Sequence, residues 1–343
     1  MRNSRKNLIR KFVYENVRDH AADIARLITE EFNVTRQSAN KYMRELVDDG
    51  LLTRTGNTKG REYQLAILAS KNFEFDVTPD LAEDFLWSEY VLPWIGTVEK
   101  NVEEICGYGF TEMVNNVVDH SDSSRLSIYL ERTAATVTMI VRDFGVGIFK
   151  KIQTECGLHD ERDAILELSK GKLTTDVQSH TGEGIFFSSR MFDEYNIASG
   201  SLFYGRIFNK SDWLVEREDH SLIQGTSITM TIDLNTDRTQ KKVFDDHAPE
   251  FEDYGFTRTH VPVKLVLYGT ESLISRSQAK RVLARFDRFT EVILDYQDVD
   301  AIGPSFADEI YRVFQNQHPD IHLFSFNTTP AIDRMIKRAE SNN

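Results

Sequence analysis

Apolar residues recur at helical spacing in three segments near the N-terminus, and two short alternating segments follow them. We predict helices over residues 7–17, 21–32 and 35–50, the last with Thr35 as its N-cap and Gly50 as its stop. The stretch "LLTRTGNTKGREYQL" (51–65) predicts two short strands around a basic turn that contains glycine. The chain therefore begins with a helical module that ends in a hairpin.

Strands and helices alternate along the rest of the chain. The segments "RLSIYLE" and "TVTMIVRD" predict strands, and the C-terminal part predicts the order strand 261–269, helix 275–289, strand 291–296, helix 305–317, strand 321–326 and a last helix from Pro330. This pattern indicates a multi-domain α/β protein with regions at 1–70, 75–240 and 258–343. The acidic stretch 233–253 is the expected linker into the last region.

The charge is unevenly distributed. The chain of 343 residues has a net charge of −13, yet residues 1–65 hold 13 of the 41 Lys and Arg and nine of the 54 Asp and Glu, a local charge of +4. A basic N-terminal module on an acidic body predicts different partners for the two parts. Chance surface charge is the alternative.

Composition places the protein in a reducing compartment. With 40% hydrophobic and 28% charged residues, the chain has the composition of a soluble globular protein. Its cysteines, Cys106 and Cys156, have no metal-ligand spacing, and no apolar run has the length of a signal peptide or a membrane span. We expect a cytoplasmic protein without a membrane anchor.

A polar edge on one amphipathic segment is the first chemical signal. In "GFTEMVNNVVDHS" (109–121) the apolar residues recur at helical spacing, while Glu112, Asn116 and His120 follow each other at four-residue intervals. Residues at that spacing lie above one another on a helix. An acid, an amide and an imidazole thus share one edge of a half-buried helix.

Three glycine motifs follow this helix in order. Asp143-x-Gly145-x-Gly147 comes directly after a strand, Gly182-x-Gly184 precedes a helical pattern, and the pair Gly225-Thr226 is expected to open a strand. Each alone is compatible with an ordinary turn. Together with Glu112-x-x-x-Asn116, over residues 80–235, they resemble the GHKL family of gyrase-type topoisomerases, chaperone ATPases, histidine kinases and mismatch-repair ATPases. The resemblance implies the α/β sandwich of that family, the Bergerat fold.

The GHKL resemblance implies an ATP and Mg²⁺ site. Asn116 would supply an oxygen ligand to Mg²⁺, which keeps waters and phosphate oxygens as its other ligands. Glu112, one turn earlier, would polarise a water toward the γ-phosphate as general base. Asp143 would accept the adenine amino group. The remaining expected cofactor-binding residues are Gly145 and Gly147 near the base, Gly182 and Gly184 at a phosphate-binding helix start, and Thr226 near the adenine.

The segment 149–181 is the expected ATP lid, a long polar loop in which Lys170 and Lys172 are weak candidates for phosphate contacts. Two positions depart from the kinase branches of the family. Asp119 stands where those branches carry Lys or Arg, and Ile185 and Phe186 shorten the second glycine motif. His120 stays unassigned. The acidic Asp119 favours a hydrolase over a kinase.

The N-terminal module resembles a winged helix-turn-helix, which implies DNA binding through its third helix and its hairpin. The candidate DNA-binding residues are Arg36, Gln37, Asn40, Lys41 and Arg44 on the helix and Arg54, Lys59 and Arg61 on the hairpin. Contacts of the hairpin residues with phosphates would make the affinity depend on salt. A winged helix that binds protein is the alternative.

The segment "EVILDYQDVDAIGPSFADEIYRVF" resembles a STAS domain, a fold of anti-sigma-factor antagonists, and the resemblance covers residues 260–340. Pro304 takes the place of the phospho-acceptor serine of that family. We expect Ser305 to act as a helix N-cap, with Asp308 three residues later. A STAS-like domain implies a protein partner.

Taken together, these resemblances predict an intracellular regulator in which ATP, with Mg²⁺, is bound and slowly hydrolysed by a GHKL domain that controls a DNA-binding winged helix and a STAS-like interaction domain. Two alternatives stay open. One is an anti-sigma-like protein serine kinase or partner-switching binder that acts on a STAS domain, and the other is a nucleotide-binding module without catalysis. A homodimer is compatible with either.

Overall fold

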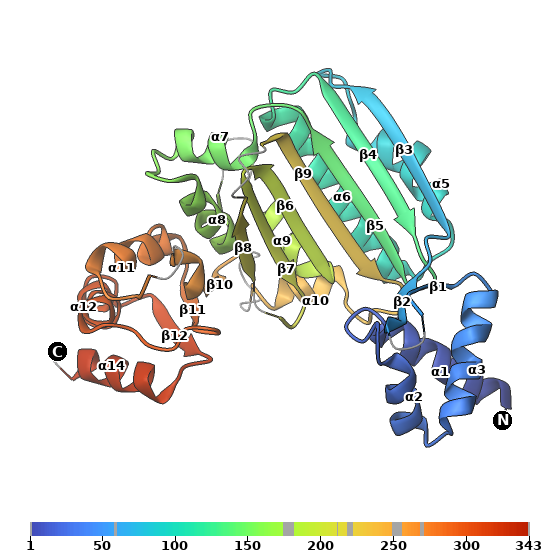
Figure 1. The fold of residues 1–343 in the computed structure, drawn as a ribbon. Helices are drawn as coiled ribbons and strands as arrows, with labels where there is room; N and C mark the ends of the chain where they lie inside the picture. Colours follow the sequence, from blue (N-terminus) through green and yellow to red (C-terminus); the bar gives the residue numbers. More distant parts are fainter. Residues whose placement is uncertain are drawn as a thin grey trace.

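The structure is a computed structural model that describes residues 2–57, 60–173, 182–210, 212–217, 222–248, 256–267 and 271–341. Its N-terminal module begins with α1 (Arg2–Asn16), α2 (Ile24–Phe32) and α3 (Arg36–Asp48). The antiparallel strands β1 (Leu52–Thr55) and β2 (Glu62–Leu65) follow (Figure 1). Thr35 caps α3, since its side chain accepts a hydrogen bond from Ser38 N at 3.2 Å. The predicted order of helices and hairpin is confirmed.

The middle of the chain forms an antiparallel sheet of seven strands in the order β3-β4-β5-β9-β6-β7-β8. The strands are β3 (Ala69–Asp76), β4 (Arg125–Arg132), β5 (Thr136–Asp143), β6 (Glu194–Gly200), β7 (Leu202–Ile207), β8 (Trp213–Glu216) and β9 (Ile223–Asp233). Buried and partly exposed side chains alternate along β4, β5 and β9, as expected for strands with one face on a core.

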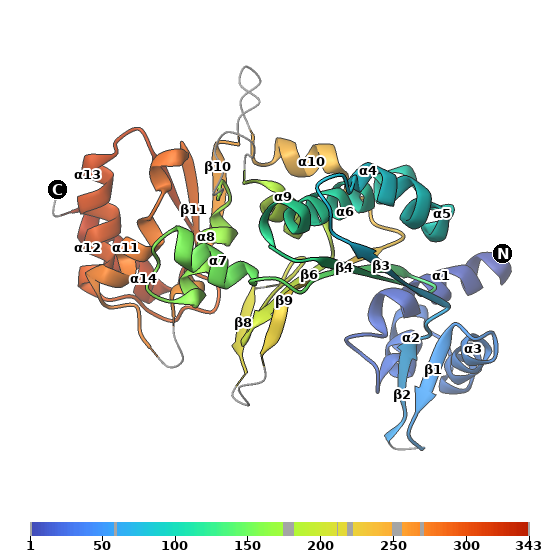
Figure 2. The same ribbon diagram turned by 90° about the horizontal axis from the view of Figure 1, so that it is seen from above.

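Helices cover one face of this sheet. Figure 2 shows them together on the side opposite the N-terminal module: α4 (Glu83–Leu86), α5 (Leu92–Ile95), α6 (Lys100–His120), α9 (Gly184–Met191) and α10 (Gln240–Asp245). A single π-helical turn (Trp87–Val91) joins α4 to α5. The central helix α6 buries Phe110, Met113, Val114 and Val117 in the core. The long apolar stripe of α6 therefore fixes its polar edge relative to the sheet.

The C-terminal domain (residues 258–341) has a parallel sheet in the order β10-β11-β12. Its elements are β10 (Arg258–Pro262), a 3₁₀ turn (Val263–Val266), α11 (Arg276–Leu283), a second 3₁₀ turn (Phe286–Arg288), β11 (Glu291–Asp295), α12 (Pro304–Asp308), a π-helical stretch (Glu309–Phe314), α13 (Gln315–Gln317), β12 (His322–Phe326) and α14 (Pro330–Glu340). Its buried residues form one continuous core with those of the middle of the chain, whereas the N-terminal module has a core of its own.

Three expectations about local structure are wrong. The expected lid 149–181 is not a long loop, because it contains α7 (Ile148–Glu155) and α8 (Glu161–Lys170), and α8 buries an apolar stripe; residues 174–181 lie outside the described part. The expected linker 233–253 contains α10, whose Val243 is buried against the core. Gly225 lies inside β9 instead of opening it, and Gln224 and Gly225 interrupt the pairing of β9 with Ser199 and Gly200 of β6.

Two expectations about the C-terminal domain also need correction. The strand expected at 261–269 ends at Pro262, which lacks an amide hydrogen for the ladder, and the next residues form a 3₁₀ turn that buries Val263, Leu265 and Val266. Ser305 is not the N-cap of α12. Gly303 holds that position, and Pro304 is the first helical residue, where its fixed φ suits the helix and its missing N–H costs no bond.

Candidate functional site

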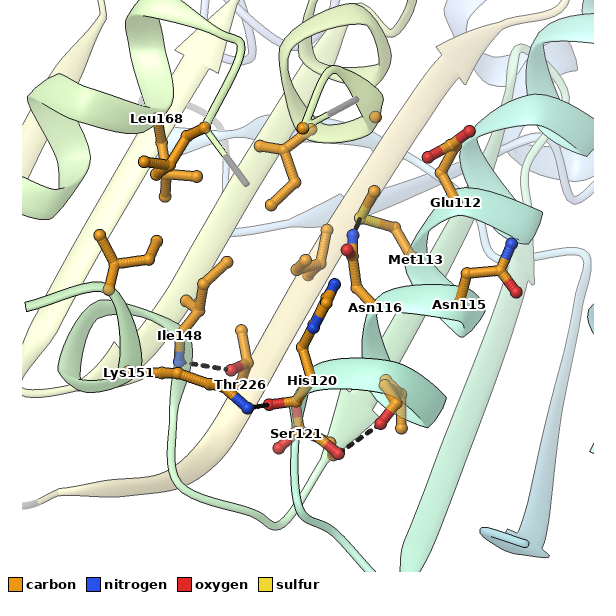
Figure 3. A pocket seen from close by; sticks show the side chains of 18 of the residues that line it. Glu112, Met113, Asn115, Asn116, His120, Ser121, Ile148, Lys151, Leu168 and Thr226 are labelled. Atoms are coloured by element: carbon orange, nitrogen blue, oxygen red, sulfur yellow. Dashed lines mark hydrogen bonds between the residues drawn. The ribbon is translucent and has the colours of Figure 1, made fainter. Parts of the chain in front are cut away.

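The polar edge of α6 borders a cavity of about 310 Å³. Glu112, Asn116 and His120 all line this cavity (Figure 3). Figure 3 shows Asn116 and His120 projecting from α6 toward the space between Leu168 and Ile148. The buried side chains of Phe110 and Val114 anchor α6 in the core, while Met113 and Val117 are buried at the cavity beside the polar edge.

Of the expected catalytic residue and the seven expected cofactor-binding residues, all but Gly145 line this one cavity. They are Glu112, Asn116, Asp143, Gly147, Gly182, Gly184 and Thr226. The structure thus brings together α6, the end of β5, the start of α9 and β9, which are far apart in the sequence. Gly145 does not line the cavity. Its backbone N–H donates to Asp143 Oδ1 at 2.8 Å, and a Cβ atom there would lie 1.8 Å from the Ser121 carbonyl oxygen.

The Glu112 carboxylate lies at the N-terminal end of α9. A Cβ atom added to Gly184, the first residue of that helix, would lie 2.0 Å from Glu112 Oε2. The backbone N–H groups of a first helical turn have no partner within the helix, so the end of α9 attracts negative charge. Glu112 and a bound anion would therefore meet the same end of α9.

The Asn116 amide occupies the middle of the cavity wall. Its Nδ2 lies 3.9 Å from Met113 Sδ, a long contact with a weak acceptor. The buried Tyr195 hydroxyl lies 3.0 Å from the same sulfur atom. Met113 thus contacts both Asn116 and Tyr195, and the half-buried Asn116 side chain lines the cavity.

Asp143 forms the floor of the cavity at the end of β5. It is 4% exposed, and burial raises the pKa of its carboxyl, although hydrogen bonds from Gly145 and Thr226 partly oppose that shift. The Thr226 hydroxyl also accepts a bond from Ile148 N at 3.0 Å. Asp143, Thr226 and the first turn of α7 therefore hold one another in place.

Glycine is required at two positions beside Asp143. Gly147 has a φ of +90°, and a Cβ atom there would lie 2.7 Å from Ser199 Oγ. Gly225 has a φ of +72°, and its Cβ atom would lie 2.3 Å from the Asp143 carbonyl oxygen. Both backbones thus adopt a conformation that L side chains rarely take, and they pack too closely for a side chain. Gly147 lines the cavity, and Gly225 packs against the Asp143 backbone.

Sequence reasoning missed Lys151, a cation on the cavity wall. Lys151 Nζ donates to the His120 carbonyl oxygen at 2.7 Å and lies 3.6 Å from Asp122. Its position three residues after Ile148, which also lines the cavity, was a usable signal, since residues at that spacing share a helix face.

The candidate phosphate contacts of Lys170 and Lys172 are wrong. Lys170 is fully buried and its Nζ donates to Glu167 and to backbone carbonyls of the C-terminal domain. Lys172 Nζ donates to the Arg288 carbonyl oxygen at 2.8 Å. Neither lysine lines the cavity, because both side chains are used in the contact between α8 and the C-terminal domain.

The candidate DNA-binding residues of the N-terminal module lie on α3 and on the hairpin. Arg36, Gln37, Lys41 and Arg44 are exposed on α3, with Asn40 half-buried between them. Their spacing places them along one face of the helix, opposite the buried Ala39, Met43 and Leu46. On the hairpin, Arg54 is exposed and Arg61 is half-buried, and Lys59 lies outside the described residues.

Two features are absent from the described residues. In the described ranges, no group of three or more His, Cys, Asp or Glu side chains is arranged to hold a metal ion. No helix among the described segments combines the length and the apolar character needed to cross a bilayer.

Comparison with known proteins identifies one part of the chain. Residues 278–333 match the family described as STAS-like domain of unknown function (DUF4325). The matched segment runs from α11 to α14. No curated protein matches the chain. The C-terminal domain of this mixed α/β protein is therefore STAS-like, in agreement with the resemblance of "EVILDYQDVDAIGPSFADEIYRVF".

Proposed function

We propose that the protein binds ATP with Mg²⁺ in the α6 cavity and hydrolyses it slowly, and that the bound nucleotide controls the N-terminal module and the STAS-like domain. The observation that carries this proposal is the convergence of Glu112, Asn116, Asp143 and Thr226 on one cavity from separate segments. Its volume of about 310 Å³ is at the lower end of the range of small-molecule sites.

The hydrogen-bonding and metal-binding groups around the cavity fit ATP with Mg²⁺. The buried carboxylate of Asp143, held by Gly145 and Thr226, is a specific acceptor for the exocyclic amino group of adenine. The α9 N-terminus provides backbone N–H groups for phosphate oxygens. Asn116 would be the single protein ligand of the metal, which is compatible with the absence of a cluster of His, Cys, Asp or Glu among the described residues.

Glu112 is the proposed general base. When bound, Mg²⁺ would neutralise phosphate charge and orient the phosphates. Glu112 lies at Gly184, where the terminal phosphate would meet the α9 N-terminus, so its carboxylate can orient a water and accept its proton. Asp119 is exposed at the end of α6, and an acid at this position, where the kinase branches of the GHKL family carry Lys or Arg, favours transfer to water over transfer to a protein.

We propose that the N-terminal module binds DNA and that the STAS-like domain binds a protein partner. The exposed basic face of α3 (Arg36, Lys41 and Arg44) supports DNA binding by a winged helix, with the hairpin meeting phosphates. The STAS-like domain supports a protein-interaction role. A serine kinase is the second candidate, because Ser305 is exposed at the start of α12 and its side chain makes no capping bond there.

One assay separates these candidates. ATP turnover and phosphate incorporation are measured together on the wild type, Glu112→Gln and Asn116→Ala. We expect turnover in the wild type, none in Glu112→Gln with ATP still bound, and no Mg²⁺-dependent binding in Asn116→Ala. Radiolabel retained on Ser305 would favour the kinase, and wild-type protein that binds no ATP would refute both.

A further inference from the structure

The helix α8 lies between the cavity and the C-terminal domain. Every residue from Ala164 to Gly171 is buried, although the segment contains Glu167, Ser169 and Lys170. A helix buried on all sides normally lies in the centre of a core. Here Leu168 lines the cavity, whereas Glu167 and Lys170 face the C-terminal domain.

A buried ion cluster joins α8 to the C-terminal domain. The Glu167 carboxylate accepts from Lys170 Nζ at 2.7 Å and from Arg285 Nε at 2.5 Å. Lys170 Nζ also donates to the carbonyl oxygens of Arg281 and Ala284, at 3.0 and 2.9 Å. All these partners are buried or nearly so, so the cluster is shielded from salt and water. Arg285 has a φ of +62°, a conformation that non-glycine residues adopt only when their surroundings hold them.

The residues after α8 connect this cluster to the cavity wall. Arg285 Nη1 donates to the Lys172 carbonyl oxygen at 3.1 Å, and Lys172 Nζ donates to the Arg288 carbonyl oxygen at 2.8 Å. The next residue, Leu173, lines the cavity and its N–H donates to the Gly182 carbonyl oxygen at 3.2 Å. The C-terminal domain thus holds the segment that carries Leu173.

Close packing leaves this segment little freedom. Gly171 has a φ of +79°, and a Cβ atom there would lie 2.5 Å from the Phe256 ring and 2.9 Å from the Phe186 ring. Phe186 in turn follows Ile185, which lines the cavity. Tightly packed contacts of this kind transmit displacement from one side to the other. Removing the C-terminal domain from α8 would therefore release the wall formed by Leu168 and Leu173.

We propose that the STAS-like domain is an internal partner of the cavity: its docking on residues 167–173, through Glu167 and Arg285, holds the wall in place and tightens the binding of ATP with Mg²⁺. This inference rests on the proposed function. A wall that is already ordered loses less conformational entropy when the ligand binds. Because linkage is reciprocal, bound nucleotide strengthens the docking of the STAS-like domain by the same factor.

The test uses the full-length chain and a fluorescent, non-hydrolysable ATP analogue with Mg²⁺. Arg285→Ala removes the guanidinium that joins Glu167 to the Lys172 carbonyl. Arg276→Ala is the matched control, since Arg276 is exposed on the same domain and lies beside Asp308 and Glu309 of that domain. We expect Arg285→Ala to weaken binding by about fivefold or more, the lower end of typical allosteric coupling, and Arg276→Ala to leave it unchanged.

Hydrogen exchange on the wild type gives a second readout that needs no variant. The analogue should slow amide exchange in α11, which makes no contact with the cavity. If the analogue binds the wild type but exchange in α11 stays the same, or Arg285→Ala binds as tightly as the wild type, the internal-partner proposal is wrong and the proposed function survives. If the wild type binds no analogue, both fail.

Discussion

The Glu112 carboxylate lies against Gly184, the first residue of α9, so closely that a methyl group on Gly184 would be 2.0 Å from Glu112 Oε2. The acid thus reaches a helix N-terminus that belongs to a segment about 70 residues later in the chain. A glycine at this position leaves room for the Glu112 carboxylate. The contact between Glu112 and Gly184 therefore places the proposed base beside the proposed phosphate site.

Gly184→Ala tests this contact. The added methyl group should displace the flexible Glu112 side chain from the α9 N-terminus while the backbone stays in place. We expect kcat for ATP to fall by about tenfold or more, within the usual contribution of a general base, and KM to change little. Steady-state kinetics measures both. A fall in affinity with unchanged kcat would contradict the assignment of Glu112.

Asp143→Asn separates binding from stability. Burial raises the pKa of Asp143, so the fold disfavours its ionised form. That cost is present above the folded-state pKa and absent below the ordinary Asp range. We therefore expect Asp143→Asn to raise Tm at pH 7, and the gain in Tm should vanish as the pH falls toward the ordinary pKa of Asp. The same variant should no longer bind ATP. Calorimetry across pH with added ATP measures both effects.

The ion cluster on α8 predicts an asymmetry between two variants. Glu167→Gln leaves Lys170 and Arg285 buried without their shared carboxylate, which should cost about 3–5 kcal/mol of the free energy of unfolding. Lys170→Met should cost less, because Glu167 keeps Arg285, methionine fills a similar volume, and only the uncharged carbonyls of Arg281 and Ala284 lose their donor. Burial also lowers the pKa of Lys170 to about 8, so its charge is already disfavoured. Equal losses in urea unfolding would contradict the shared role of Glu167.

The basic face of α3 predicts a salt-dependent interaction with DNA. Arg36→Ala and Arg44→Ala should each weaken binding to duplex DNA and reduce the slope of log K against log salt by about one. Arg26→Ala is the matched control, since Arg26 is exposed on α2 and paired with Asp23 and Glu30. Fluorescence anisotropy over a salt series measures the slope. No binding at low salt, or equal effects of all three variants, would exclude α3 as the DNA contact.

Much of the candidate site could be predicted because its residues lie within short sequence motifs. The four-residue spacing of Glu112 and Asn116 fixes them on one edge of α6, and the glycine at position 147 marks a backbone with positive φ. The resemblance of Asp143-x-Gly145-x-Gly147 to the GHKL motif predicts that both glycines lie near the base, but Gly145 does not line the cavity. Its contact with Ser121, made across two loops, cannot be deduced from spacing.

The contacts of α8 could not be predicted, because they depend on tertiary packing. Lys170 in "SKGKLTT" has the pattern of a solvated loop, and burial becomes favourable only when Glu167 and the carbonyls of Arg281 and Ala284 surround it. The same holds for α10, because its charged sequence predicts an exposed segment although Val243 is buried. Contacts with residues far away in the sequence determine the burial of α8 and α10, and no short stretch of sequence contains both partners.

Binding of ATP by the purified full-length protein tests the central claim most directly. Isothermal titration with ATP, in the presence and absence of Mg²⁺, is carried out on the wild type and on Asn116→Ala. We expect one site per chain in the wild type, with tighter binding in the presence of Mg²⁺, and the loss of that Mg²⁺ dependence in Asn116→Ala. Absence of ATP binding by the wild type, or identical Mg²⁺ dependence in both proteins, would contradict it.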